Sequence, residues 1–263
     1  MSVLTIERAG AVTTLTINRP DAFNALNTDV IGALLEAVTA AENDPAVRAV
    51  VLTGSGEKAF SAGADLKELA GMGPDRARQV LSSGQQAFRI IERSSVPIIA
   101  AVNGVALGGG FELALASTFP VLSMKASLGL PESGLGLIPG YGGTQRLPRA
   151  VGQRVAVHLM VTGSRLDADR AYALGLTPVP PVAPEELLAA ATGIAEKIAA
   201  QGPLAVRAIL HALEVGRDAP LDAGLGVETG LAALAVAGEE STEGIGAFLE
   251  RRPAKFANPE AQR

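Results

Sequence analysis

The sequence of 263 residues contains no cysteine and no tryptophan, and only two of its residues are histidines. The absence of cysteine excludes disulfides, thiolate nucleophiles and cysteine-based metal sites. Both histidines, His158 and His211, fall in segments predicted to be helical and lie far from any glycine-rich loop, so we interpret them as surface or packing residues. We therefore predict no metal site.

The chain also lacks a concentrated positive charge. Its net charge is −5 and its pI is about 5.2, and its lysines and arginines are scattered along the sequence. Binding of nucleic acid without sequence preference needs a basic face that neutralises phosphates. We therefore expect no nucleic-acid partner.

No segment has the pattern of a signal peptide or of a membrane span. The N-terminal segment carries Glu7 and Arg8 where a signal peptide would be apolar. The longest uncharged run, residues 94–111, contains Pro97, Asn103 and four glycines, which suits a strand and a turn better than a membrane helix. We expect a cytoplasmic protein that has no membrane partner.

Apolar strands alternate with helices in the first half of the chain. Residues 2–20 hold two alternating runs around Ala9 and Gly10 and predict a β-hairpin. A helix capped by Asn27 or Thr28 follows. Farther on, strands that are apolar throughout alternate with helices, which indicates a parallel sheet covered on both faces. From about residue 145 the segments are mainly helical, so the sequence predicts an α/β core followed by a helical C-terminal part.

Two segments pass from an apolar strand through small residues into a helix: GEKAFSAGADLKEL (56–69) and AVNGVALGGGFELALAS (101–117). The N–H groups in the first turn of a helix have no intrahelical partners and carry the positive end of the helix dipole. Small residues allow a ligand oxygen to approach these groups closely. Two N–H groups that converge on one point would form an oxyanion hole. The alternative for Gly108–Gly110 is an ordinary tight turn.

Two glutamates lie beside glycine-rich backbone. Glu112 is in the first turn of the helix after the three glycines, and Glu132 follows Pro131 in a loop-like segment. Paired carboxylates in a partly dry pocket do not ionise independently, and such a pair can position a water, remove one proton and donate another. The alternatives are a helix-dipole contact for Glu112 and a solvated loop charge for Glu132.

Four motifs of the chain resemble the crotonase (enoyl-CoA hydratase/isomerase) superfamily in that family's order and approximate spacing. They are FSAGADLKEL, AVNGVALGGGFELALAS, GLPESGLGLIPGYGGTQRLPR and FLERRPAKF, and the resemblance extends from Ile17 to Phe256. It implies a crotonase-like α/β spiral of ββα units over residues 1–195, followed by a helical trimerisation region over residues 196–263. The resemblance also implies a homotrimer or a dimer of trimers.

The resemblance implies roles for individual residues. Ala64 and Gly109 match the two oxyanion N–H donors, and Gly140 matches a glycine whose backbone helps to hold the catalytic water. Glu112 and Glu132 match the two catalytic glutamates of enoyl-CoA hydratases. The implied contacts to coenzyme A (CoA) are Ala22, Phe23, Ala62, Asp65, Leu66, Lys255 and Phe256. The last two often reach a CoA that a neighbouring subunit holds. Since the substrate carries the CoA, we predict no separate cofactor.

Because both glutamates are present, we expect an enoyl-CoA hydratase, a lyase of fatty acid β-oxidation that converts a trans-2-enoyl-CoA to a 3-hydroxyacyl-CoA. The main alternative is a Δ3,Δ2-enoyl-CoA isomerase, although many isomerases of the family lack one of these glutamates. An RNA-binding relative would need a basic helix, and residues 74–93 balance their arginines partly with Asp75 and Glu92. A non-catalytic acyl-CoA-binding protein would have no need of both catalytic glutamates.

Overall fold

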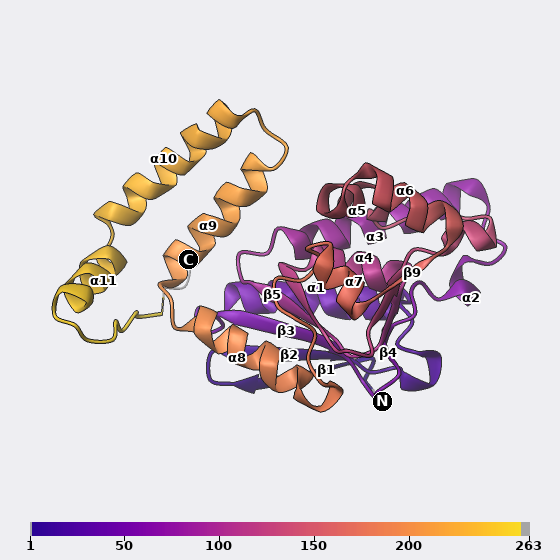
Figure 1. Cartoon of the computed structure of the whole chain (residues 1–263), viewed down its shortest axis with the longest axis horizontal. Helices are drawn as coiled ribbons and strands as arrows, with labels where there is room; N and C mark the ends of the chain where they lie inside the picture. Colours follow the sequence, from indigo (N-terminus) through magenta and orange to yellow (C-terminus); the bar gives the residue numbers. More distant parts are fainter. Residues whose placement is uncertain (1, 259–263) are drawn as a thin grey trace.

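The chain begins with an antiparallel hairpin, as its alternating sequence predicts. Strands β1 (Leu4–Ala9) and β2 (Val12–Ile17) pair around Gly10, which has a φ of 60°. The structure is a computed structural model that describes residues 2–258. Figure 1 shows an α/β core with a group of C-terminal helices extending from one side.

The hairpin is the edge of a five-stranded sheet with the order β1-β2-β3-β5-β7. All neighbours after the hairpin run parallel. The further strands are β3 (Ala49–Gly54), β5 (Ile98–Val102) and β7 (Phe119–Leu122). Every residue of β3 and β5 is buried, which is typical of a parallel sheet with helices on both faces.

A second sheet has the order β4-β6-β8-β9. Its strands are β4 (Ala59–Ser61), β6 (Val105–Leu107), β8 (Ser127–Gly129) and β9 (Arg165–Asp167). Each of the pairs β3-β4, β5-β6 and β7-β8 contributes one strand to each sheet. A helical segment follows each pair, so the structure confirms the expected spiral of ββα units.

Helices and 3-10 turns connect the strands of the core. They are η1 (Pro20–Ala22), α1 (Thr28–Asn43), α2 (Leu66–Leu69), α3 (Pro74–Glu92), α4 (Gly109–Ala116), η2 (Glu132–Leu135), α5 (Gly143–Val151), α6 (Gln153–Thr162), α7 (Ala168–Ala173), η3 (Pro184–Glu186) and α8 (Leu187–Ala199). The Asn27 side chain accepts a hydrogen bond from the Val30 N–H at 3.0 Å, so Asn27 is the cap of α1.

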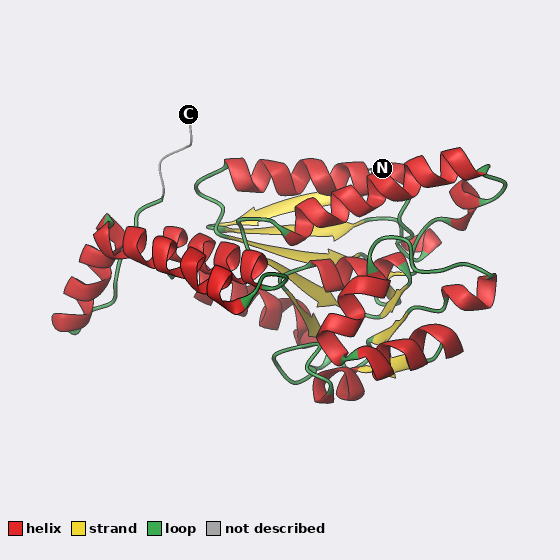
Figure 2. Ribbon diagram, turned by 90° about the horizontal axis from the view of Figure 1, so that it is seen from above, coloured by secondary structure: helices red, strands yellow, loops and turns green. Residues whose placement is uncertain are grey.

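Alternate residues of the first sheet pack against different helices. Val50 and Leu52 of β3 belong to a cluster that includes buried side chains of α1 and α3. Ala49 and Val51 belong to a second cluster, in which α8 covers the opposite face. Figure 2 shows helices on both sides of the strands. The prediction of a sheet covered on both faces is therefore confirmed.

The C-terminal helices form an arm that lies beside the core. We define the arm as α9 (Pro203–Gly216), α10 (Leu221–Ala237) and α11 (Glu239–Leu249). It follows α8, so the predicted boundary between residues 195 and 196 falls inside the last turn of a core helix. Among residues 2–258 no single helix is long and apolar enough to cross a membrane, and only α10 and α11 together, bent by 68°, have sufficient length and composition.

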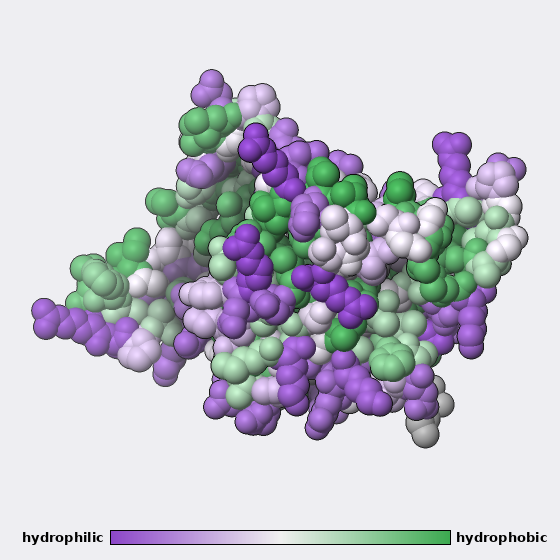
Figure 3. All heavy atoms as spheres, turned by 45° about the vertical axis from the view of Figure 1, so that its right-hand side comes forward, coloured by the Kyte–Doolittle hydropathy of each residue, from purple (hydrophilic) through white to green (hydrophobic). Residues whose placement is uncertain are grey.

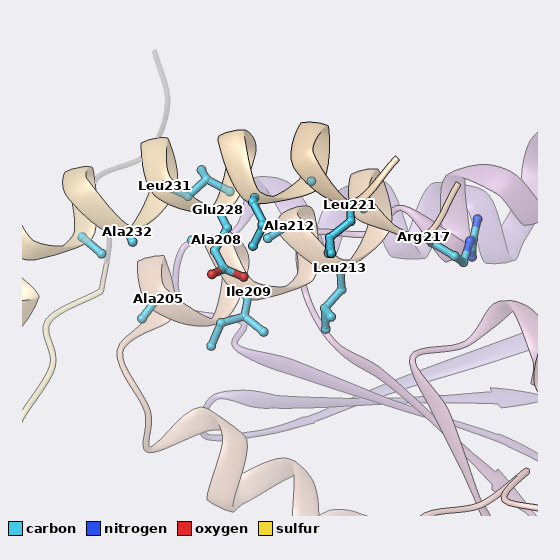
Figure 4. A pocket seen from close by; sticks show the side chains of 14 residues that line it. Ala205, Ala208, Ile209, Ala212, Leu213, Arg217, Leu221, Glu228, Leu231 and Ala232 are labelled. Atoms are coloured by element: carbon cyan, nitrogen blue, oxygen red, sulfur yellow. The ribbon is translucent and has the colours of Figure 1, made fainter. Parts of the chain in front are cut away.

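The arm exposes many large apolar side chains. Leu213, Leu234 and Phe248 are 67%, 73% and 81% exposed. A groove of about 810 Å³ between α9 and α10 is lined mainly by apolar residues, among them Ile209 and Leu221 (Figure 4). Figure 3 shows hydrophobic side chains, in green, on the surface of the arm at the left.

Candidate active site

The three glycines before Glu112 lie where β6 passes into α4, and close packing requires at least two of them. Gly108 has a φ of 49°, in the left-handed region that favours glycine. A Cβ atom on Gly110 would overlap the carbonyl oxygen of Ser61 at the end of β4. The glycines therefore bring the first turn of α4 against the end of the neighbouring ββα unit.

This approach brings together the two predicted oxyanion donors, Ala64 and Gly109. The Ala64 nitrogen lies 3.3 Å from the position that a Cβ atom on Gly109 would occupy. Gly63, with a φ of 104°, makes the close turn before Ala64. Within residues 2–258, neither the Ala64 N–H nor the Gly109 N–H donates to a backbone or side-chain acceptor. Two free N–H groups thus lie side by side at the start of α4.

Glu112 is 1% exposed, and one of its oxygens is bound by backbone. Oε1 accepts hydrogen bonds from the Tyr141 N–H at 2.8 Å and from the Gly143 N–H at 2.7 Å. Burial raises the pKa of Glu112 to about 7, against the opposing effect of these two hydrogen bonds. The charge of Glu132 raises this pKa further. A carboxylate with such a pKa exchanges protons readily near neutral pH.

Glu132 begins η2 and lies next to the same glycine turn. Its Oε1 is 2.8 Å from the position of a Cβ atom on Gly108, whose carbonyl oxygen accepts the Glu112 N–H at 2.9 Å. Its Oε2 is buried and has no hydrogen-bond partner among the described residues. Burial raises the pKa of Glu132 as well. Neither glutamate is therefore a plain solvated charge, and the two form an interacting pair.

The loop after η2 supplies donors that sequence reasoning did not identify. The sequence predicts a role for Gly140, and the structure places this residue next to Tyr141, with its carbonyl oxygen accepting from Gln85 at 2.9 Å. The donors to Glu112 are the next residues, Tyr141 and Gly143. The glycine-rich segment GYGG, residues 140–143, indicates that another group can approach the backbone closely. It does not indicate that this group is the carboxylate of Glu112.

Most of the predicted CoA-binding residues lie together at one end of the first sheet. The Ala62 N–H donates to the carbonyl oxygen of Phe23 at 2.9 Å, next to Ala22. Asp65 forms an ion pair with Arg19 at 3.0 Å, which lowers the pKa of Asp65. Leu66 and Phe23 are both 51% exposed, so each presents an apolar side chain for a ligand to contact.

Lys255 and Phe256 lie apart from this group. The Lys255 N–H donates to Glu243 of the arm at 2.7 Å, and the Phe256 carbonyl oxygen accepts from Arg48 at 2.7 Å. Arg48 precedes β3, whereas the other residues predicted to bind CoA, Ala22 to Leu66, follow the opposite ends of the strands. Within one chain the structure does not bring the tail residues to the site, and the expectation that they reach a neighbouring subunit's ligand stays a prediction.

The arrangement can stabilise negative charge on an oxygen and transfer protons beside it. The two N–H groups of Ala64 and Gly109 are the candidates for the charge-stabilising part. Glu112 and Glu132 are the candidates for the acid/base part. His158 and His211 belong to α6 and α9 and not to the segments that carry these residues. In the described part of the chain, no group of three or more histidine, aspartate and glutamate side chains is arranged to hold a metal ion.

The sequence matches proteins of known activity along nearly its whole length. A family profile described as enoyl-CoA hydratase/isomerase matches residues 7–259. A crotonyl-CoA hydratase from Syntrophomonas wolfei is 44% identical over 251 residues, which cover 95% of this chain and 96% of the relative. A short-chain-enoyl-CoA hydratase from Clostridium acetobutylicum is 41% identical over 247 residues, which cover 94% of each chain.

Solved structures give the same result for the fold. A crystal structure of an enoyl-CoA hydratase from Bacillus anthracis superposes with a TM-score of 0.94 at 39% identity, covering 98% of this chain and 100% of the other. One from Mycobacterium tuberculosis has a TM-score of 0.90 at 35% identity, covering 98% and 100% of the two chains. The similarity includes the arm as well as the core.

Proposed function

This chain belongs to the enoyl-CoA hydratase/isomerase family, and we propose that it adds water across the 2,3-double bond of a trans-2-enoyl-CoA to give a 3-hydroxyacyl-CoA. The observation that carries the proposal is the pair of glutamates, the buried Glu112 and the half-buried Glu132 with its buried Oε2, beside two free N–H groups. The related proteins named crotonyl-CoA hydratase and short-chain-enoyl-CoA hydratase support the same reaction.

The N–H groups of Ala64 and Gly109 activate the substrate. The thioester carbonyl oxygen accepts from both groups, and negative charge develops on this oxygen as the enolate forms. Donors already in place stabilise that charge without reorganisation, and loss of one such donor typically costs ~3 kcal/mol of transition-state stabilisation. Withdrawal of electron density toward the thioester makes C3 electrophilic, so water adds at C3.

The two glutamates supply the proton transfers. Glu112 binds two N–H groups through Oε1, which leaves Oε2 to accept a proton from the attacking water. Glu132 exchanges the proton at C2, and burial of its unpartnered Oε2 favours the neutral, proton-donating form. The water proton goes to Glu112 and the C2 proton comes from Glu132, so the product gains the atoms of one water molecule. The proton left on Glu112 then passes to Glu132, which restores both groups for the next turnover. Gly140, just before the Tyr141 donor, helps to hold the water.

The structure favours hydration over two of the alternatives that the sequence leaves open. Isomerisation of a 3-enoyl-CoA moves one proton between two carbons and has no need of a second carboxylate that activates water. RNA binding would use the four arginines of residues 74–93, but two of them, Arg89 and Arg93, form ion pairs with Glu214, and Arg89 also binds Glu92. We therefore propose an acyl-CoA as the partner and no nucleic acid.

We further propose that the protein is a cytoplasmic homotrimer or dimer of trimers, without a resident cofactor. The exposed apolar side chains of the arm support assembly, because they need a surface that one chain does not provide. The position of Lys255 and Phe256 supports it too. These residues can contact CoA at Phe23, Ala62 and their neighbours only if the CoA belongs to another subunit.

The test is loss of the enoyl-thioester absorbance of crotonyl-CoA, compared between wild type and the variants Glu112→Gln and Glu132→Gln. We expect rapid hydration by wild type and a loss of ~10²-fold or more in both variants. Glu36→Gln, an exposed change on α1, is the matched control and should retain wild-type activity. Product analysis with a 3-enoyl-CoA measures isomerisation directly. Wild type that isomerises this substrate but does not hydrate crotonyl-CoA would contradict the proposal.

A further inference from the structure

The turn that binds Glu112 is itself bound by an arginine. Arg146, on α5, donates from Nη1 to the carbonyl oxygen of Tyr141 at 2.7 Å. The N–H of the same tyrosine donates to Glu112 Oε1 at 2.8 Å, and the Gly143 N–H donates to it at 2.7 Å. One short segment of backbone therefore binds the arginine through a carbonyl oxygen and the carboxylate through N–H groups.

The residue between these two donors leaves room for the guanidinium. Gly142 has a φ of 111°, and a Cβ atom there would overlap Nη1 of Arg146. Any other residue would both strain the backbone and displace the arginine. The absence of a side chain at Gly142 therefore leaves the space that the Arg146 guanidinium occupies.

A buried carboxylate on α3 fixes the same guanidinium. Arg146 Nη2 donates to Glu92 at 2.9 Å, and the two side chains are only 13% and 10% exposed. Glu92 also accepts from Arg89 at 2.8 Å and from Arg217 at 2.7 Å. Burial alone would raise the pKa of Glu92, but the bonds from Arg146 and Arg89 outweigh it and lower the pKa to about 2. Glu92 is therefore ionised throughout the neutral pH range.

Glu92 also connects this part of the core to the arm. Arg217 directly follows α9, and Glu214 within α9 forms ion pairs with Arg89 and Arg93 of α3. The sequence of contacts runs from the arm through Arg217 and Glu92 to Arg146, and from there to the turn at Glu112. Arg146 is the residue at which these contacts reach the candidate active site.

We infer that Arg146 is a positioning residue for hydration: it fixes the turn at Tyr141–Gly143 so that both N–H groups meet one oxygen of Glu112 and leave the other for water. The inference rests on the proposed function, in which Glu112 activates that water. Arg146 acts through Tyr141 and has no contact with the reacting atoms. Its effect is to keep the carboxylate in one orientation, and a misplacement of about 1 Å at such a site can cost ~10²-fold in rate.

The variant that tests the inference is Arg146→Met, with Arg149→Met as the matched control. Arg149 lies on the same helix, but it is half-exposed, pairs with Asp218 and makes no hydrogen bond to the backbone of residues 141–143 in the described part of the chain. We expect Arg146→Met to lower kcat by ~10²-fold with little change in KM, because the position of the carboxylate is altered and the CoA contacts are not. Arg149→Met should retain the kcat of wild type.

A pH profile separates positioning from a general loss of stability. The groups that act on the Glu112 pKa include Glu132 on η2, which raises it, and Arg146 on α5, which lowers it. Removal of the arginine charge should therefore move the acid limb of kcat to higher pH. Arg146→Lys keeps the charge but loses the two-pronged contact, so we expect a limb near that of wild type and a kcat that is still reduced.

Hydrogen exchange provides a readout that does not depend on the reaction. Exchange of the peptide spanning residues 139–147 should be faster in Arg146→Met and in Arg146→Lys, and unchanged in Arg149→Met. A wild type without hydratase activity would overturn the proposed function, while the exchange data would still test the positioning. If Arg146→Met has the same kcat, the same acid limb of kcat and the same exchange rate as wild type, the inference is overturned. If this variant does not fold, unchanged kcat and exchange in Arg146→Lys would overturn it instead.

Discussion

The core and the arm bury their apolar residues to very different degrees. Every residue of β3 and β5 is buried, whereas none of the 17 residues of α10 is. In the rest of the arm, α9 buries only Pro203 and α11 only Ala247. A large exposed apolar surface marks an interaction site. The core is therefore covered by its own chain, and the arm leaves an apolar surface uncovered.

The glycines of the two regions differ in the same way. A Cβ atom on Gly110 would overlap Ser61 in the core, close to the candidate active site. Gly226 and Gly230 on α10 have no described atom within 4 Å of such a position, apart from their own helix. Gly110 thus allows a backbone contact on which the site depends. Gly226 and Gly230 are unconstrained within a single chain.

The largest effect that we expect comes from a charge on the apolar surface of the arm. Leu234→Glu should cause dissociation, because an interface would have to bury an unpaired carboxylate. Sedimentation should show a mass near the 26.7 kDa of one chain. The thermal unfolding of the core should remain cooperative. Ile6→Glu, an equivalent change at an exposed position of β1, is the control. An assembly that survives Leu234→Glu would show that this part of the arm is not the interface.

The next largest effect tests the close packing of the core. Gly110→Ala should destabilise the protein by about 3 kcal/mol, because the new methyl group overlaps the rigid backbone at Ser61. Gly32→Ala is the control within the core, since nothing lies within 4 Å of its Cβ position on α1. There the better helix propensity of alanine should stabilise the protein by about 1 kcal/mol. Denaturant unfolding at fixed protein concentration measures the stability of both variants. Equal changes in Gly110→Ala and Gly32→Ala would show that the contact at Gly110 is not specially tight.

Much of the fold could be predicted from local pattern. The hairpin, the buried parallel strands and the cap at Asn27 depend on neighbouring residues, and the periodicity of the sequence reports such features directly. The spiral arrangement of ββα units came only from the resemblance of the motifs to a family. Alternation of strands and helices indicates a parallel sheet, but it does not specify that each unit divides its strands between two sheets.

The candidate site was predicted only in part, because its contacts join distant residues. The predicted donors Ala64 and Gly109 do lie together, and their chemical roles stay predictions. The bond from the Tyr141 N–H to Glu112 spans 29 positions, and the one from Arg217 to Glu92 spans 125. No local pattern encodes either contact. Both depend on how helices pack after the core has formed, so sequence reasoning identified Glu112 but not the groups that hold it.

An effect of similar size should appear in the pH dependence of stability. The folded-state pKa of Glu112 is about 7, above its ordinary value of 4.5. The folded protein therefore binds more protons than the unfolded chain between these values, and stability falls as the pH rises from about 4.5 to about 7. A pKa shift of this size corresponds to a loss of about 3 kcal/mol in the free energy of unfolding.

Glu112→Gln should remove this dependence while its side-chain oxygen still accepts the two N–H groups. We expect the variant to be inactive, yet more stable than wild type at pH 8, with a smaller difference at pH 5. Melting temperatures across this range give the measurement. A stability difference that does not change with pH would mean that Glu112 titrates normally in the folded protein.

The smallest effect is expected in the arm, from the substitution of Glu243. This residue resembles Glu92 in its pKa but not in its surroundings. The hydrogen bond from Arg252 lowers the pKa of Glu243 to about 2, the same value as that of Glu92. A lowered pKa gives stability above about pH 4.5 that is lost as the pH falls toward 2. The Glu92 side chain is 10% exposed and binds three arginines. Glu92→Gln should therefore weaken the core at pH 7 and reduce the loss of stability at acid pH.

Glu243 and Arg252 are solvated, and water and salt screen their attraction. Glu243→Gln should therefore leave the unfolding curve of the core unchanged between pH 2 and pH 7 at moderate salt, and a flattened acid limb in this variant would show that the arm and the core unfold as one unit.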